Sequence, residues 1–198
     1  MIEYLQQTWL EIAGVICGLL YLVLMIKENI WCWIFGIVGS LITVIVFFET
    51  KLYLEAGLNA YYVLAGFYGW YFWKQNRAGG KKTPPVVEWK ALAHILNIII
   101  CTLAILLIGN FMANYTDSPR PYFDTSITVF GISATILEAR KILSGWIYWF
   151  FINGFSIWLQ YDREIYFYAL LSAFYTVMCI KGYMEWRKSY KKENNILT

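Results

Sequence analysis

Seven long stretches of this chain are apolar and contain no Asp, Glu, Lys or Arg, and this pattern restricts the fold more than any other feature. They cover residues 12–26, 30–48, 56–73, 91–112, 125–137, 142–161 and 165–180. A helix needs about 20 mostly apolar residues to cross the roughly 30 Å hydrocarbon core of a bilayer. The shorter stretches reach that length with the residues that flank them. The sequence therefore predicts an all-α membrane protein with seven transmembrane helices.

The composition favours a bilayer over water as the surrounding solvent. Hydrophobic residues make up 60% of the chain and charged residues 15%, whereas about a quarter of a typical soluble domain is charged. Seven spans would use most of the 198 residues and leave no room for a soluble catalytic domain. The first ten residues contain no Lys or Arg, so we expect the first stretch to be a retained span and not a cleaved signal peptide.

Residues that carry covalent chemistry are sparse and lack a motif spacing. His94 is the only histidine, and no Ser, Lys or Asp stands at a spacing that would complete a nucleophilic triad with it. The four cysteines form no C-x-x-C pair, and no phosphate-binding loop of the G-x-x-x-x-G-K-[ST] type occurs. We therefore expect no metal, no cofactor and no enzymatic activity. A membrane enzyme or an assembly scaffold is the alternative from a different functional class.

Basic residues divide unequally between the two sides of the predicted membrane domain. If seven spans alternate, one side carries only Lys51, Arg120 and Arg163, and the other carries the remaining thirteen of the sixteen Lys and Arg residues. Basic residues concentrate on the cytoplasmic side of membrane proteins. We therefore expect the amino terminus outside and the carboxyl terminus in the cytoplasm. The net charge is only +3 and the basic clusters lie at helix ends, so they indicate topology and no nucleic-acid partner.

The two halves of the chain match each other without gaps when Gly18 is aligned with Gly131. The same register pairs Lys27 with Arg140, Trp33 with Trp146, Tyr53 with Tyr166, Gly69 with Gly182, and Trp73 with Trp186. This pattern predicts two three-helix repeats joined by a connector helix, a 3+1+3 parallel repeat like that of SWEET carriers. The expected boundaries are 1–76 for the first repeat, 77–113 for a cytoplasmic loop and the connector, 114–188 for the second repeat and 189–198 for a cytoplasmic tail.

Polar side chains inside the predicted spans are few, and the repeat arranges them in pairs. Ser40 corresponds to Asn153, and Asn59 corresponds to Ser172. Polar groups within a bilayer either bind a ligand or join helices by hydrogen bonds. For the two asparagines we favour contact with a substrate, and for the two serines both interpretations stay open.

Several aromatic side chains are expected to line the same cavity as these polar groups. They are Tyr62, Trp146, Trp149, Trp158 and Tyr175. Trp146, Trp149 and Asn153 follow each other at helical spacing, so their side chains can enclose a flat ring. If that ring is cationic, the electron-rich face of Trp or Tyr attracts it by about 0.5 to 2 kcal/mol. Trp70, Trp73, Trp89 and Trp186 lie near the predicted interfaces, and we assign them to an anchoring belt.

These features together resemble the PnuC-type vitamin transporters, best known for nicotinamide riboside, over nearly the whole chain. The matching residues are Glu11, Gly14, Gly18, Leu19, Leu20, Phe35, Gly36, Tyr53, Tyr68, Gly69, Trp70 and Trp73 in the first half, and Phe123, Asp124, Thr125, Arg140, Lys141, Trp146, Trp149, Asn153, Ser156, Gly182 and Trp186 in the second. The resemblance implies a 3+1+3 fold in a bacterial inner membrane. It also implies facilitated diffusion of a vitamin that cytosolic phosphorylation then traps, and it leaves a homo-oligomer open.

The chain departs from the pattern of nicotinamide riboside carriers at two positions. Gly39 stands where an Asn is often found, and Asn59 stands where a Gln is often found. Relatives in the superfamily are thought to carry thiamine or riboflavin, and thiamine is also a cationic heteroaromatic. We therefore expect nicotinamide riboside as the first candidate substrate and thiamine as the second.

Overall fold

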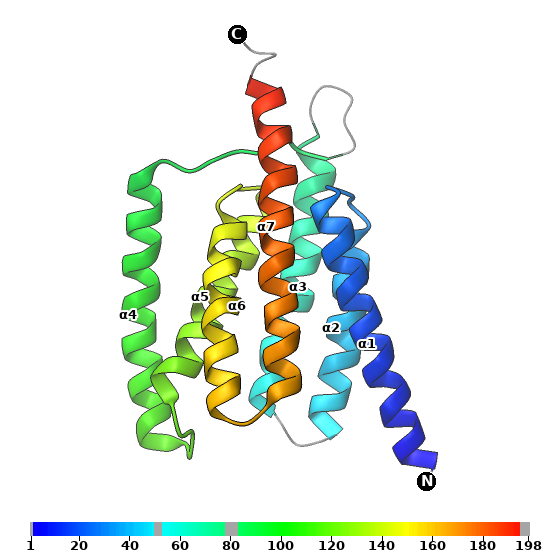
Figure 1. Ribbon diagram of the computed structural model, residues 1–198, viewed down its shortest axis with the longest axis vertical. Helices are drawn as coiled ribbons and strands as arrows, with labels where there is room; N and C mark the ends of the chain where they lie inside the picture. Colours follow the sequence, from blue (N-terminus) through cyan, green and yellow to red (C-terminus); the bar gives the residue numbers. More distant parts are fainter. Residues whose placement is uncertain (1, 50–52, 78–82, 195–198) are drawn as a thin grey trace. The chain divides into compact units, whose positions relative to one another are not determined.

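The computed structural model describes residues 2–49, 53–77 and 83–194, and these form seven α-helices (Figure 1). The helices are α1 (Ile2–Ile26), α2 (Cys32–Glu49), α3 (Tyr53–Gln75), α4 (Ala91–Tyr115), α5 (Pro121–Ala139), α6 (Gly145–Asp162) and α7 (Tyr166–Asn194). Each apolar stretch of the sequence falls on one of them, so the predicted seven helices are confirmed. Lys51, Lys81 and Lys82, which enter the orientation argument, lie outside the described residues.

Three of the described helices are long and apolar enough to cross a membrane by length and composition alone. They are α2, α4 and α7, and the apolar segment Ile12–Ile26 of α1 is shorter. Helix α7 continues to Asn194, so the first part of the expected tail is helical.

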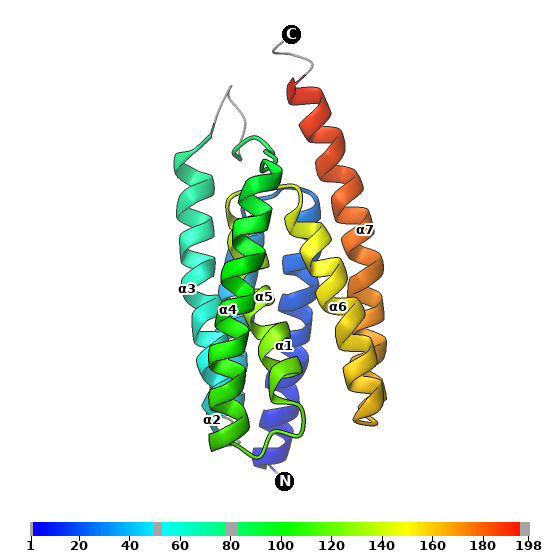
Figure 2. The same ribbon diagram turned by 90° about the vertical axis from the view of Figure 1, so that its left-hand side faces the viewer.

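The chain divides into two compact units, residues 1–85 and 86–198. In the first unit α2 packs against both α1 and α3. In the second unit α5 packs against α4 and α6, and α6 packs along α7, beside which it runs in Figure 2. The expected connector helix, α4, therefore lies within the second unit.

The turns that follow α1 and α5 have the same hydrogen-bonding pattern. Each contains a non-glycine residue in the left-handed region, Glu28 at φ 54° and Lys141 at φ 59°. The amide of Glu28 donates to the carbonyl of Met25 at 3.0 Å, and the amide of Asn29 donates to that of Leu24 at 2.9 Å. The two bonds at the equivalent positions after α5 both measure 2.9 Å. This is the Schellman arrangement, which satisfies carbonyl groups at a helix end.

A pair of tryptophans with perpendicular rings lies at the core of each unit. The ring centroids of Trp33 and Trp73 are 5.6 Å apart, and those of Trp146 and Trp186 are 5.4 Å apart, with an interplanar angle of 89° in both pairs. Trp73 and Trp186 are 0% exposed, so their assignment to an interfacial belt was wrong. The end of an apolar stretch can face a neighbouring helix as readily as it faces lipid, and here both side chains pack against other tryptophans.

Glycine makes this close packing of tryptophan possible. A Cβ added to Gly182 of α7 would lie 2.6 Å from the ring of Trp146. A Cβ added to Gly69 of α3 would lie 2.4 Å from the ring of Trp33. Gly182 and Gly69 thus let α7 and α3 approach the indole of the preceding helix more closely than any other residue would allow.

Candidate functional site

Several of the predicted site residues of the second unit lie where α6 meets α7. Trp149 and Asn153 lie one turn apart on α6, so their side chains share one face of the helix. The Nδ2 atom of Asn153 donates to the carbonyl oxygen of Trp149 at 2.9 Å and contacts the Sγ atom of Cys179 on α7 at 3.7 Å. Asn153 therefore has a fixed orientation at the contact between the two helices.

Trp149 carries a buried donor without a partner among the described residues, as do the core residues Trp33 and Trp146. Its indole Nε1 lacks an acceptor among the residues that the structure describes. A buried donor left unpaired costs roughly 1 to 3 kcal/mol, and an acceptor on a bound molecule would remove that cost. The turn from Trp149 to Asn153 therefore offers an aromatic face, an N–H donor and an amide group side by side.

Ser172 and Tyr175 lie on the neighbouring helix α7. The hydroxyl of Ser172 is buried and donates to the Oε1 atom of Gln160 on α6 at 2.8 Å. This bond joins two helices, which is the structural interpretation that the sequence left open for the serine. Tyr175 follows Ser172 by three residues, so it shares its face of α7, and its side chain is half-buried.

Trp146 and Trp158 have different surroundings from Trp149, although all three lie on α6. Trp146 is 1% exposed and packs against Gly182 and Trp186, so its contacts are those of a core residue. Trp158 is 45% exposed. The guanidinium carbon of Arg120 lies 5.3 Å from the Trp158 ring centroid. The structure thus brings Trp149 and Asn153 together and places Trp158 in a separate cluster.

The remaining predicted site residues lie in the first unit. Asn59 and Tyr62 stand three residues apart on α3, where their half-buried side chains share one face. The ring of Tyr62 also lies 5.6 Å from that of Tyr61. Ser40 is half-buried on α2.

The structure reveals a polar network on another face of α6 that sequence reasoning missed. The hydroxyl of Tyr148 lies 3.3 Å from the Nδ1 atom of His94 and accepts a hydrogen bond from the Nδ2 atom of Asn97 at 3.3 Å. The same Asn97 Nδ2 donates to the hydroxyl of Ser133 on α5 at 2.9 Å. This network joins α4, α5 and α6.

The polar side chains named at the contact of α6 and α7 are two amides, a hydroxyl, a thiol and an indole. Such groups bind and orient a neutral or cationic ring but transfer no proton at neutral pH. Among the described residues, no group of three or more His, Cys, Asp or Glu side chains could hold a metal ion. The arrangement is suited to binding.

Comparison with known proteins identifies relatives over almost the whole chain. The family model described as "Nicotinamide mononucleotide transporter" matches residues 8–188. The "Nicotinamide riboside transporter PnuC" of Escherichia coli is 26% identical over 212 residues, covering 95% of this chain and 89% of that protein. The "Riboflavin/roseoflavin transporter RibM" of Streptomyces davaonensis is 26% identical over 182 residues, covering 90% of this chain and 84% of that protein.

A solved structure has the same fold. It is described as the crystal structure of the vitamin B3 transporter PnuC and matches with a TM-score of 0.75 at 22% identity. The match covers 93% of this chain and 83% of that chain.

Proposed function

This chain belongs to the nicotinamide mononucleotide transporter family, and from that membership we propose that it carries nicotinamide riboside into the cell. Relatives from several bacteria bear the name of nicotinamide riboside transporters, which supports this substrate. The mechanism proposed is facilitated diffusion, with phosphorylation in the cytosol trapping the vitamin. The membrane is the inner membrane of a bacterium.

The structural observation behind the proposed site is the indole N–H of Trp149 beside the oriented amide of Asn153, an N–H without an acceptor in the described part of the chain. In our proposal the nicotinamide ring stacks on Trp149, and a substrate oxygen accepts a hydrogen bond from its Nε1 atom. The Nδ2 atom of Asn153 already donates to Trp149 and Cys179, so its Oδ1 atom is the group that accepts from a substrate hydroxyl. Nicotinamide riboside carries a positive charge on its ring, which the face of an indole attracts.

The other predicted residues have separate roles in this proposal. Tyr175 and Ser172 border the site on α7, and Ser40, Asn59 and Tyr62 of the first unit stay predicted substrate contacts. We assign Trp146 to the floor of the site because that side chain is held by Gly182 and Trp186. Trp158 belongs to the entrance on the side of Arg120.

We further propose that the chain is a duplicated three-helix unit in 3+1+3 order, like SWEET carriers, with all seven helices crossing the membrane. The equal tryptophan pairs, at matching positions of the two halves, support the duplication. The proposed boundaries are 1–76, 77–113, 114–188 and 189–198. The distribution of Lys and Arg supports an external amino terminus and a cytoplasmic carboxyl terminus. A homo-oligomer stays a prediction.

Riboflavin is the second candidate substrate because RibM is also similar over most of the chain. Riboflavin has a larger, uncharged ring system, so it would gain stacking on Trp149 without the attraction of a cation. Thiamine, which has a cationic ring, is a third candidate on chemical grounds alone.

A calorimetric panel tests the substrate assignment. Detergent-solubilised protein is titrated with nicotinamide riboside, thiamine and riboflavin under the same conditions. We expect binding of nicotinamide riboside to be the tightest. Tighter binding of riboflavin would indicate a riboflavin carrier similar to RibM. The absence of binding by all three compounds would reject the proposal.

A further inference from the structure

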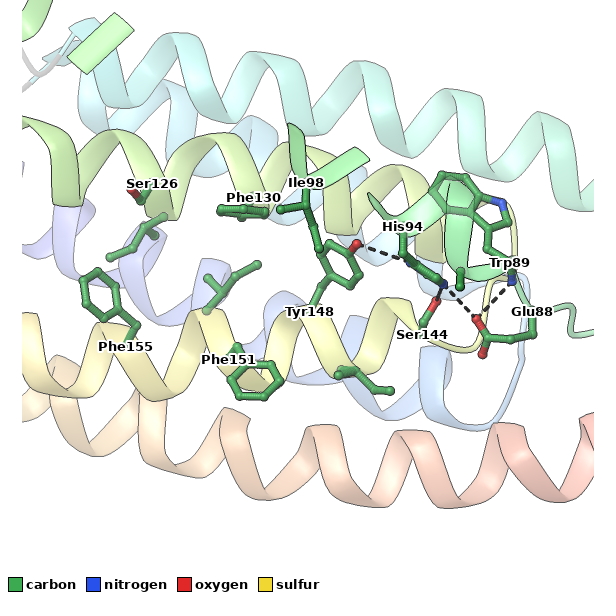
Figure 3. Close-up of a pocket in the computed structure, with 14 residues that line it drawn as sticks. Glu88, Trp89, His94, Ile98, Ser126, Phe130, Ser144, Tyr148, Phe151 and Phe155 are labelled. Atoms are coloured by element: carbon green, nitrogen blue, oxygen red, sulfur yellow. Dashed lines mark hydrogen bonds and ion pairs between the residues drawn. The ribbon is translucent and has the colours of Figure 1, made fainter. Parts of the chain in front are cut away.

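A long groove of about 780 Å³ runs between α4, α5 and α6 of the second unit (Figure 3). Ile98 borders it from α4, Phe130 from α5, and Phe151 and Phe155 from α6. None of the residues assigned to the proposed transport site lines it. The groove lies on a different face of α6 from Trp149 and Asn153, so it requires a separate explanation.

One end of the groove is polar, and the rest is apolar except for Ser126 and the hydroxyl of Tyr148. At the polar end the Nε2 atom of His94 lies 3.4 Å from the Oε1 atom of Glu88 and 3.3 Å from the hydroxyl of Ser144. The backbone amide of Trp89 also donates to this Oε1 atom at 3.0 Å. Among the described residues that line the groove, Glu88 is the only Asp, Glu, Lys or Arg. The groove is therefore amphipathic along its length and carries a carboxylate at one end.

The length of the groove corresponds to one leaflet of a bilayer. Ser144 and Phe155 mark its two ends along α6 (Figure 3). A rise of about 1.5 Å per residue places them about 16 Å apart, and half of the hydrocarbon core measures about 15 Å. Trp89 and Lys90, which precede α4 next to the polar end, are residue types that favour the membrane interface.

We propose that this groove binds one phospholipid with an amine headgroup, of the phosphatidylethanolamine type. One acyl chain lies along Phe130 and Phe151, and the ammonium group meets the carboxylate of Glu88. The hydroxyl of Ser144 provides a hydrogen-bonding group for the phosphate and glycerol region, and His94 holds Glu88 and Ser144 together at this end. This site goes beyond the proposed function and does not depend on which vitamin is carried.

The shape and charge of the groove favour this occupant over two others. A nucleoside would leave several hydroxyl groups without partners along the apolar wall, and unpaired buried polar groups are costly. An anionic lipid would bring its negative charge next to Glu88. Helix α4 has exposed apolar side chains on several sides, including Leu96, Ile98 and Ile108, so acyl chains can reach the groove from the surrounding bilayer.

Native mass spectrometry of the detergent-solubilised full chain tests the headgroup. The protein is offered equal amounts of phosphatidylethanolamine and phosphatidylglycerol that have identical acyl chains. We expect one retained lipid per chain, with phosphatidylethanolamine favoured about threefold to fivefold, the size expected of a partly exposed ion pair. Glu88→Gln should reduce the ratio to about one, whereas Glu185→Gln, on the exposed surface of α7, should leave it unchanged. Equal retention of the two lipids by the wild type would overturn the proposal.

A second pair of variants tests the groove itself. Ile98→Trp places a large ring in the groove and should abolish retention of lipids with either headgroup. Ile99→Trp is the matched control, because Ile99 is exposed to a similar extent, 49% against 46%, but does not line the groove. Thermal unfolding of both variants verifies that they are folded. Retention of lipid by a folded Ile98→Trp variant at the wild-type level would place the lipid elsewhere and reject this site.

Discussion

Single side chains determine how tightly the proposed transport site holds a ring. Trp149 combines an aromatic face with an N–H group that has no acceptor in the described part of the chain. Asn153 is held by the Trp149 carbonyl and by Cys179, so its amide is already oriented before a substrate arrives. An oriented amide gives up less conformational entropy on binding than a mobile one.

Replacing Asn153 by Ala should weaken binding of nicotinamide riboside by roughly 1 to 3 kcal/mol, because a buried hydrogen bond to the substrate is lost. Calorimetry on the purified variant measures this change. Asn110→Ala, which alters an exposed amide on α4, is the matched control and should bind like the wild type. Unchanged affinity in a folded Asn153→Ala variant would remove Asn153 from the site.

Two substitutions of Trp149 separate its two proposed contributions. Trp149→Phe keeps an aromatic face and removes the N–H donor, so it should cost about 1 kcal/mol of binding free energy. Trp149→Ala removes the ring as well and should cost about 1 kcal/mol more, the usual size of an aromatic contact. Calorimetry with nicotinamide riboside measures both variants. Equal affinities of the two would show that the ring does not stack on the substrate.

Sequence reasoning can find a polar residue in a span, but it cannot say which neighbour that residue meets. Ser172 was found through its partner in the repeat, whereas Gln160, which accepts its hydrogen bond, was missed. The repeat gives Gln160 no polar counterpart, since it pairs with Phe47. The amide of Gln160 within an otherwise apolar stretch was the sequence feature that could have identified this residue. Tyr148 was missed because tyrosine is abundant in this chain and a helix apolar on all sides shows no preferred face.

At the scale of helices, hydropathy predicts where the elements lie, and close packing determines how they meet. The stretch 125–137 was the shortest, and the structure extends it to Pro121–Ala139. Trp73 and Trp186 were wrongly assigned to the interfacial belt. The position of a residue in an apolar stretch does not reveal whether its side chain faces lipid or a neighbouring helix. Gly69 and Gly182, which pack against the neighbouring tryptophans, correspond to each other in the sequence repeat. The repeat did not show which residues they contact.

Gly182→Ala should lower the free energy of unfolding by roughly 1 to 3 kcal/mol, because the new methyl group would overlap the ring of Trp146. Gly69→Ala should lower the free energy of unfolding by a similar amount, because the new methyl group would overlap the ring of Trp33 in the first unit. The control is Gly154→Ala, where a Cβ would meet nothing within 4 Å. Thermal unfolding in detergent measures all three variants. A Gly182→Ala variant as stable as Gly154→Ala would show that the tryptophan packing is looser than described.

At the scale of the whole molecule, the chain is a multi-pass membrane transporter and not an enzyme, as its family and relatives establish. Its helices form two compact units. The sequence predicted the number of helices through hydropathy and the kind of protein through the resemblance. Its substrate depends on a few contacts, and a repeat or a hydropathy pattern does not specify those.

Reporter fusions test the orientation that the basic residues predict. Green fluorescent protein folds and fluoresces in the cytoplasm, and alkaline phosphatase is active only outside it. Green fluorescent protein fused after Thr198 should therefore fluoresce. Alkaline phosphatase fused at the same position should be inactive. Phosphatase activity from the carboxyl-terminal fusion would reverse the predicted orientation.

A facilitated-diffusion carrier moves nicotinamide riboside through its binding site without consuming energy. The most direct measurement is uptake of labelled nicotinamide riboside by liposomes that contain the purified protein and no ATP. We expect saturable uptake that reaches the external concentration and accelerates when unlabelled substrate is present inside. Uptake no faster than into protein-free liposomes, or uptake that begins only when ATP is added, would contradict it.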